Sequence, residues 1–227
     1  MNTDLARFNM IEQQIRPWEV LDQNVLALLG VVRREDFVPP AHRALAFADT
    51  QVPLAPRGDH HTSGQCMLEP KVEARLLQEL AVQRHEKVLE IGTGSGFMAA
   101  LLAHRAMQVT SLEVAPTLVR MARENLRRCG RTDVSVLEVT PQEGALGLPG
   151  EAPFDVIVLS GSVAQVPQAL LRQLKVGGRL AAIVGATPIM RARLFTRVSD
   201  VAWSDVDLFD TVAPRLLGFA EPTRFHF

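Results

Sequence analysis

The sequence predicts an α/β fold in which helices cover both faces of a doubly wound, mainly parallel sheet. Apolar runs of strand length alternate with helical patterns from residue 88 to residue 184, as is typical of βαβ units. The first strand ends in three glycines at alternate positions, and a helical run follows at once. After Gly185 no helical pattern intervenes, so we expect an antiparallel hairpin at the edge of the sheet.

The length of 227 residues suits one compact domain. We expect residues 1–80 to form a helical and loop segment that packs on a core of residues 81–227. The net charge of −1 creates no field that would recruit nucleic acid or an anionic membrane. No signal peptide or long apolar span is evident, which indicates a cytoplasmic protein. Cys66, Cys129 and the scattered histidines lack metal-ligand spacing, so no metal is expected.

The N-terminal segment should begin with helix from Asn2 to about Leu29, because apolar residues recur there at helical spacing. Pro17 divides this pattern into two short helices. The stretch to Gly64 is irregular and rich in proline, and such a long loop in a compact domain is usually functional. Pro70 then begins the next helix.

The core elements follow from the apolar pattern and the turn residues. We expect strands at 88–91, 109–112, 134–137, 154–159 and 179–184, helices at 98–106, 116–128 and 166–174, and a turn at Gly177-Gly178. Strands at 192–199 and 202–209, with a third candidate at 212–219, should form the antiparallel edge.

The stretch K-V-L-E-I-G-T-G-S-G-F at Lys87–Phe97 is a strand, a tight glycine turn and a helix start, which together form a nucleotide-binding crevice. The dinucleotide fingerprint G-x-G-x-x-G would require glycine at residue 97, where this chain has phenylalanine. The pattern E-x-G-x-G-x-G, with Glu90 first, is instead similar to motif I of class I methyltransferases. It implies S-adenosyl-L-methionine (SAM) as the cofactor, in a Rossmann-like sheet. A turn that merely joins strand to helix, or a nicotinamide dehydrogenase, is the alternative.

The cofactor site should combine the glycine turn with the end of the following strand. Glu113 lies about one βαβ step beyond the turn, where a carboxylate can accept hydrogen bonds from both ribose hydroxyls. Leu112 and Val114 should flank the adenosine, and Asp155 and Ser160 should border the cleft. The expected cofactor-binding residues are Glu90, Gly92, Thr93, Gly94, Ser95, Gly96, Leu112, Glu113 and Val114.

Several motifs together resemble the protein-L-isoaspartate O-methyltransferases. They are V-x-R-E-x-F-V-P at Val32–Pro39, A-F-A-D at Ala46–Asp49, the glycine stretch at Val88–Phe97, A-P-F-D at Ala152–Asp155 and the run from Val166 to Gly178. The resemblance implies methyl transfer from SAM to the α-carboxylate of L-isoaspartyl residues in a protein or peptide, as a repair reaction. A carboxylate is already ionised at neutral pH, so this chemistry needs no general base.

The chain departs from the family pattern mainly on the substrate side. An ungapped comparison puts Cys66 and Leu68 at the positions where the family carries hydroxyl side chains, and leucine forms no hydrogen bond. A shifted comparison would use Thr62 and Ser63 instead. Where the family has G-D-G, the chain has Val139-Thr140-Pro141, so Thr140 becomes the candidate acceptor for the adenine amino group. The family's C-terminal substrate strand is matched only loosely by Arg215–Phe219.

Two further functions therefore stay open beside isoaspartyl methylation. One is a SAM-dependent methyltransferase with another acceptor, either a small molecule or a different protein carboxylate. The other is a protein that binds SAM without catalysing transfer. The sequence does not indicate an oligomeric state.

Overall fold

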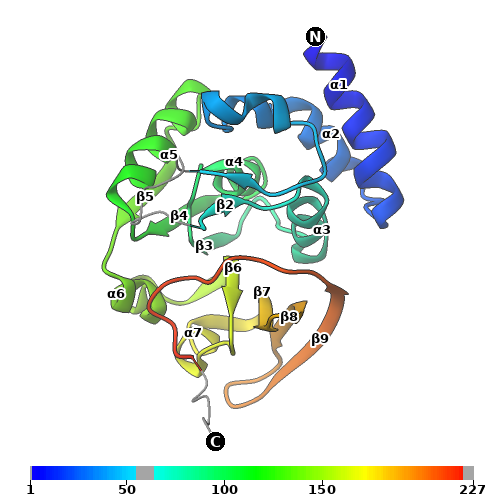
Figure 1. Ribbon diagram of the computed structural model, residues 1–227. Coiled ribbons are helices and arrows are strands. Elements are labelled where there is room, and N and C mark those ends of the chain that lie inside the picture. Colours follow the sequence, from blue (N-terminus) through cyan, green and yellow to red (C-terminus); the bar gives the residue numbers. More distant parts are fainter. Residues whose placement is uncertain (1, 55–63, 222–227) are drawn as a thin grey trace, which may run out of the picture.

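The computed structural model describes residues 2–54 and 64–221. Its main sheet has seven strands in the order β5-β4-β3-β6-β7-β8-β9. Their bounds are β3 Lys87–Ile91, β4 Gln108–Glu113, β5 Val134–Glu138, β6 Phe154–Val163, β7 Leu174–Ala186, β8 Ile189–Arg197 and β9 Trp203–Asp210. Neighbouring strands from β5 to β7 are parallel, whereas β7, β8 and β9 pair antiparallel. The predicted doubly wound sheet with an antiparallel C-terminal edge is confirmed (Figure 1).

One face of the sheet is covered by helices α3 (Pro70–Leu80), α4 (Phe97–Ala103) and α5 (Pro116–Arg128). Proline at the first helical position begins both α3 and α5, since its fixed φ suits the first turn and its missing N–H would be unpaired there. Leu76, Leu101 and Leu118 of these helices are buried in one apolar cluster with Val88 and Val158 of the sheet. This layer positions the turn between β3 and α4.

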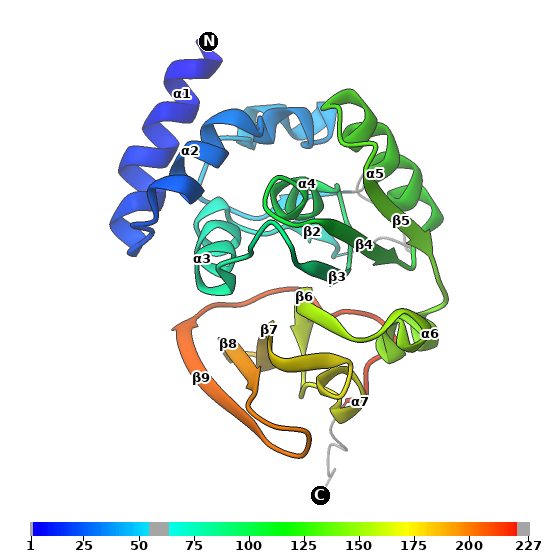
Figure 2. The ribbon, with the colours of Figure 1, turned by 180° about the vertical axis from the view of Figure 1, so that it is seen from behind.

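The opposite face is covered by two short helices, α6 (Pro141–Leu146) and α7 (Gln168–Leu171), as Figure 2 shows from behind. A second apolar cluster lies under them, and the chain after β9 contributes Phe219 and the partly buried Leu216 to it. The C-terminal segment therefore closes this face, where the helices are too short to cover it alone.

The N-terminal segment packs on the layer that contains α3. It consists of α1 (Thr3–Met10), a π-helical turn (Ile11–Ile15), a 3₁₀ turn (Arg16–Trp18) and α2 (Gln23–Val31), so the break near Pro17 is confirmed. Two 3₁₀ turns follow, Arg34–Asp36 and Pro40–Leu45, and then the short antiparallel pair of β1 (Val52–Pro53) and β2 (Cys66–Met67). The Trp18 ring contacts Phe209 of β9 edge to face, with 6.1 Å between the ring centroids. No described helix is long and apolar enough to cross a membrane.

The structure corrects several predicted elements. Residues 166–174 form only the one-turn helix α7, because β7 begins already at Leu174. The predicted turn at Gly177-Gly178 lies within β7, where a Cβ at Gly178 would come within 2.9 Å of the Asp155 carbonyl oxygen. Residues 212–219 form no strand: a single bridge joins Arg215 to Ser162, since Pro214 and Gly218 (φ +86°) interrupt regular pairing.

Helix α6 is absent from the sequence-based prediction, although its signal is present. Thr140 accepts a hydrogen bond from the backbone N–H of Glu143, and the Glu143 carboxylate accepts one from the Thr140 N–H. This reciprocal arrangement is the capping box that a threonine followed three residues later by glutamate predicts.

Candidate active site

The turn after β3 brings backbone close to an open crevice. Gly92, Gly94 and Gly96 all have positive φ values, of +93°, +54° and +85°. A Cβ at Gly92 would lie 2.7 Å from the Leu216 side chain, and one at Gly94 would lie 3.2 Å from Leu54. The turn therefore requires glycine both for its conformation and for the close approach of neighbouring groups.

A cavity opens beside this turn at the carboxyl ends of β3, β4 and β6, the point where the strand order reverses and where α/β sheets bind ligands. The sheet and the helices contribute an apolar part of its lining, consisting of Ile91, Leu112, Val114, Leu118, Val139 and Gly144. Leu54, Gln65 and Cys66 line it from the N-terminal segment, and residues 214–217 line it from the C-terminal segment. Its charged lining residues, among those described, are Glu113 and Arg215.

Glu113 is buried at the end of β4 and faces this cavity. Its carboxylate accepts hydrogen bonds from the backbone N–H groups of Gly94 (2.8 Å), Val114 (2.9 Å) and Ala115 (3.0 Å). A carboxylate has roughly four lone-pair sites, so Glu113 retains the capacity to accept from a donor in the cavity. The same contacts fix the carboxylate next to the glycine turn.

A smaller cavity lies on the other side of the turn, against α3 and α4. Its volume of about 20 Å³ is enough for a water molecule. Cys66 and Ser160 are the side chains that line both cavities, together with Gly92 and Gly94. The two cavities are therefore adjacent and share these four residues as a common wall.

Glu90 forms part of the wall of the smaller cavity and is fully buried. Its carboxyl accepts hydrogen bonds from the hydroxyls of Ser111 (2.6 Å) and Ser160 (2.7 Å), and no described cation pairs with it. Burial raises the pKa of Glu90 to about 8, although the two serine hydrogen bonds act to lower it. The carboxyl is therefore mostly neutral at pH 7.

Arg34 ties three elements together behind this cavity. Its buried guanidinium forms an ion pair with Glu73 of α3 and donates a hydrogen bond of 2.7 Å to the carbonyl oxygen of Leu68. It also lies over the ring of Phe97, the first residue of α4, at 5.3 Å from the centroid. Burial raises the pKa of Glu73 to about 7, while Arg34 acts in the opposite direction.

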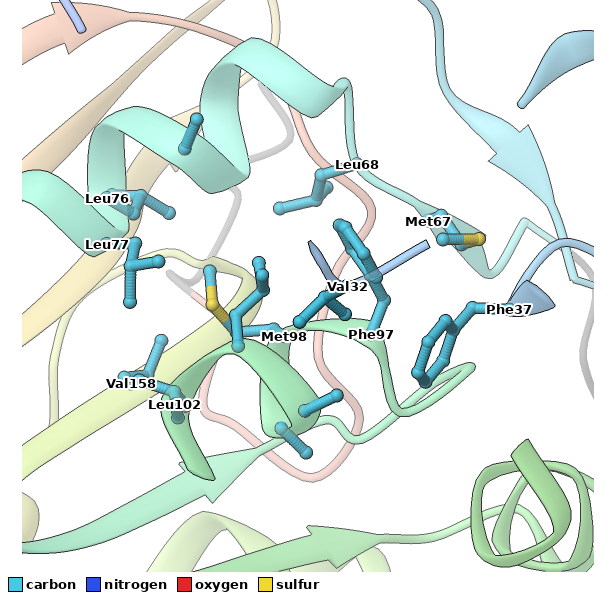
Figure 3. Close-up of a cluster of buried hydrophobic side chains, with 14 of the residues drawn as sticks. Val32, Phe37, Met67, Leu68, Leu76, Leu77, Phe97, Met98, Leu102 and Val158 are labelled. Carbon is cyan, nitrogen blue, oxygen red and sulfur yellow. The ribbon is translucent and has the colours of Figure 1, made fainter. Parts of the chain in front are cut away.

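Leu68 points into an apolar cluster with Phe97 and Met98 and is only 4% exposed (Figure 3). Cys66, two residues earlier, lies 3.3 Å from the side-chain oxygen of Gln51, and burial raises the pKa of its thiol to about 12. The loop before α3 thus presents the Gln65 amide and a neutral thiol to the larger cavity, and the thiol, Met67 and Leu68 to the smaller one, with no hydroxyl group among them. Thr62 and Ser63, the alternative hydroxyls, lie outside the described residues.

The structure brings most of the predicted cofactor residues together, but on two sides of the turn. Gly92, Gly94, Leu112, Glu113 and Val114 line the larger cavity, whereas Glu90, Thr93 and Ser95 line the smaller one beside Gly92 and Gly94. Gly96, the residue before α4, lines neither cavity. A Cβ at this position would lie 3.3 Å from the Leu126 side chain of α5.

Two residues lie away from the cavities. Thr140 lines neither cavity, and its hydroxyl caps α6. Asp155 does not border the cleft: it lies at the start of β6, the opposite end of the sheet, where it accepts hydrogen bonds from the Lys87 N–H and from Lys175. In a parallel strand only the residues near the carboxyl end reach the ligand side, and Asp155 is too early.

Sequence reasoning missed the buried pair of Arg34 and Glu73. A signal was available for Glu73, which lies three and four residues before Leu76 and Leu77 and therefore on the apolar face of α3. A carboxylate at such a position predicts a buried cationic partner. No group of three or more potential metal ligands occurs in the described part of the chain.

The fold and the site together indicate the structural class of the protein. A parallel sheet whose strand order reverses beside a glycine turn, with an acidic residue ending the next strand, is the class I methyltransferase architecture. A solved protein-L-isoaspartate O-methyltransferase superposes with a TM-score of 0.76 at 22% identity, over 95% of this chain and 66% of that one. A structure described as such an enzyme from Plasmodium falciparum, in complex with S-adenosyl-L-homocysteine, superposes with a TM-score of 0.75 at 18% identity, over 96% and 99%.

Sequence comparison resolves the family. The family model for protein-L-isoaspartate(D-aspartate) O-methyltransferase matches residues 6–206. The protein-L-isoaspartate O-methyltransferase of Methanoculleus marisnigri is 41% identical over 79% of this chain and 77% of that protein. The protein-L-isoaspartate O-methyltransferase 2 of Marinobacter nauticus is 39% identical over 92% and 91%. The chain belongs to the protein-L-isoaspartate O-methyltransferase family and is a SAM-dependent methyltransferase.

Proposed function

We propose that this chain transfers the methyl group of SAM to the α-carboxylate of an L-isoaspartyl residue in a protein or peptide. The observation that carries the proposal is the near full-length match to the Marinobacter nauticus relative, which is named for that reaction. The region matched by the family model, residues 6–206, includes the glycine turn and the loop before α3, whereas residues 214–217 of the cavity wall lie beyond it.

The larger cavity suits the methyl donor. Its apolar lining residues Leu112, Val114 and Val139 would hold an adenine ring, and Glu113 would accept hydrogen bonds from the ribose hydroxyls. Gly92 and Gly94 leave space for the rest of the molecule beside the turn. When bound, SAM supplies an electrophilic methyl group on a sulfonium. In this arrangement residues 81–227 would hold the donor, and residues 1–80 would supply much of the acceptor side.

The acceptor side of the site has to position the acceptor carboxylate and remove water from it, and no proton has to be transferred. An acceptor carboxylate is ionised at neutral pH, so its oxygen is already a nucleophile. Holding it within about 3–3.5 Å of the methyl carbon and in line with the leaving sulfur supplies most of the acceleration. We call residues 64–69 the acceptor loop. Leu68 and Met67 of this loop would exclude water, while Arg34 holds the loop to the core through the Leu68 carbonyl.

The test is methyl transfer from labelled SAM to a short isoaspartyl peptide, beside the same peptide with normal aspartate. We expect label in the isoaspartyl peptide only, in a base-labile ester. Calorimetric SAM binding is measured on the same sample. SAM binding without isoaspartyl transfer would overturn the proposal and would favour a different acceptor, or a protein that binds SAM without catalysis.

A further inference from the structure

Strand β6 carries an irregularity at the point where it passes the two cavities. Val158 pairs with Ala181 of β7, and the next pair is Ser162 with Ile183. Three residues of β6, Leu159, Ser160 and Gly161, therefore lie opposite a single residue of β7. Bulges of this kind redirect a side chain and are common beside active sites. Here the redirected side chain is Ser160.

Ser160 lies at the junction of the larger and the smaller cavity. Among the described residues that line the larger cavity, it is the only one with a hydroxyl group. The glycine after it makes room for the C-terminal segment, since a Cβ at Gly161 would lie 2.8 Å from the Leu216 side chain. The bulge therefore places Ser160 in the wall of the larger cavity, while the segment of residues 214–217 closes over its neighbour.

The acceptor loop has no hydroxyl group, and its Gln65 amide lines the larger cavity but not the smaller one, so it lies away from this junction. Leu68 cannot donate a hydrogen bond, and the Cys66 thiol is neutral and a weak donor. A carboxylate acceptor requires a donor for the oxygen that does not attack, because an unpaired buried charge is costly. A hydroxyl on a rigid strand meets this need more accurately than a loop side chain.

The group behind Ser160 allows its hydroxyl to turn outward. Glu90 accepts a hydrogen bond from Ser160 when the carboxyl is ionised, but a neutral carboxyl can donate to the serine oxygen instead. The serine O–H is then free for a ligand. The charged and titratable groups that face Glu90 are Glu73 of α3, which is paired with Arg34, and Glu113 of β4. Both disfavour a second negative charge.

We propose that Ser160 supplies the hydroxyl that binds and orients the acceptor carboxylate, the role for which the acceptor loop has no hydroxyl at residue 68. The inference rests on the proposed isoaspartyl function and names the residue that would recognise the acceptor. Ser160 is thus assigned as a catalytic residue in the sense that it touches the reacting group, whereas Glu90 positions it.

The experiment compares S160A with S111A in the isoaspartyl assay. Both serines donate to Glu90 at nearly the same distance, 2.7 and 2.6 Å, but Ser111 lines neither cavity. Loss of a hydrogen bond to a charged group costs about 10- to 100-fold in binding. We expect S160A to raise the KM for the peptide by that factor with SAM affinity retained, and S111A to change the KM by less than about threefold.

Two further variants separate recognition from structure. S160T keeps the hydroxyl, and we expect it to retain the wild-type KM. In the S160A background, L68S returns a hydroxyl from the acceptor loop, and we expect part of the loss to be recovered.

Equal increases in KM for S160A and S111A would overturn the inference, because the increase would then be caused by the lost hydrogen bond to Glu90 and not by lost contact with the acceptor. Loss of SAM affinity in S160A that matches the rise in KM would overturn it as well. If wild type methylates the peptide and S160A behaves like wild type, only this inference fails. If wild type binds SAM but does not methylate the peptide, the proposed function fails and this inference with it.

Discussion

Replacement by glutamine should change the stability of the protein in opposite directions at Glu73 and at Glu90. Both are buried glutamates that line the smaller cavity, but Glu73 is paired with Arg34, whereas Glu90 has only serine partners. Replacing a glutamate by glutamine keeps its shape and removes its charge. We expect E90Q to stabilise the protein at alkaline pH and E73Q to destabilise it.

The sign for Glu90 follows from its pKa, which burial raises from 4.5 to about 8. Between these values the folded protein holds a proton that the unfolded chain releases. Its stabilising contribution is therefore complete below about pH 4.5 and is lost as the pH rises through about 8. Each pKa unit corresponds to about 1.4 kcal/mol, which sets an upper limit of roughly 5 kcal/mol. Allowing for relaxation, we expect E90Q to exceed wild type by about 2–4 kcal/mol at pH 8.5, and by under about 1 kcal/mol at pH 5.

The magnitude for Glu73 follows from the ion pair. Removing one partner of a buried pair leaves the other charge uncompensated, at a cost of about 3–5 kcal/mol. Arg34 would keep its hydrogen bond to the Leu68 carbonyl but lose its counter-charge. Because burial raises the pKa of Glu73 to about 7, wild type itself loses stability as the pH rises from about 4.5 to 7, so the deficit of E73Q relative to wild type should be smaller at pH 8.5 than at pH 5.

The assay is urea unfolding followed by fluorescence of Trp18 and Trp203, with wild type and both variants at pH 5, 7 and 8.5. Only changes in midpoint at constant m-value count as changes in stability. A loss of stability in E90Q at pH 8.5, or a gain in E73Q, would refute the assignment of a neutral Glu90 beside an ion-paired Glu73. Parallel pH profiles for wild type and E90Q would refute it equally.

Two further predictions concern the methyl donor. Gly92→Val should weaken SAM binding at least about 100-fold by calorimetry, because its Cβ would lie 2.7 Å from Leu216 at a φ of +93°; Gly30→Ala, on α2 with open space around it, serves as the matched control and should bind normally. Normal binding by the valine variant would exclude the turn as the donor site. Glu113→Gln should weaken SAM binding by about tenfold or more, since an amide loses half of the acceptor capacity of a carboxylate; unchanged affinity would remove Glu113 from the ribose site.

The regular core could be predicted because its signals are local. Helix α5 has the predicted bounds Pro116–Arg128, and β3, β4 and β5 lie within a residue of their predicted positions. Apolar runs, a proline at the helix start and glycine after the helix end are enough to specify these elements. The predictions are wrong where the local structure depends on pairing with residues that are distant in the sequence. Whether residues 212–219 form a strand depends on Ser162, about fifty residues earlier, and only one bridge forms.

The site could be predicted only in part for the same reason. Gly92 and Glu113 follow from motif spacing, but whether a side chain faces one cavity or the other depends on packing between elements. Ser160 is predicted to border the cleft and lines both cavities, but the bulge that places it at their junction has no sequence signature in Phe154–Val163. Arg34 and Glu73 are 39 residues apart and meet only through the fold. A buried charge predicts a partner, but not which one.

The bulge of β6 and the leucine of the acceptor loop have related consequences for recognition. Leu68 turns into the cluster with Phe97 and Met98 (Figure 3), so the loop contributes exclusion of water but no polar contact from that position. Ser160 contributes the polar contact from the sheet, where backbone pairing on both sides of the bulge holds it more firmly than a loop would. Selectivity for the acceptor should then depend on the sheet and on the proton held by Glu90. Apolar substitutions in the loop, such as L68I, should accordingly lower stability more than they change the KM for the acceptor.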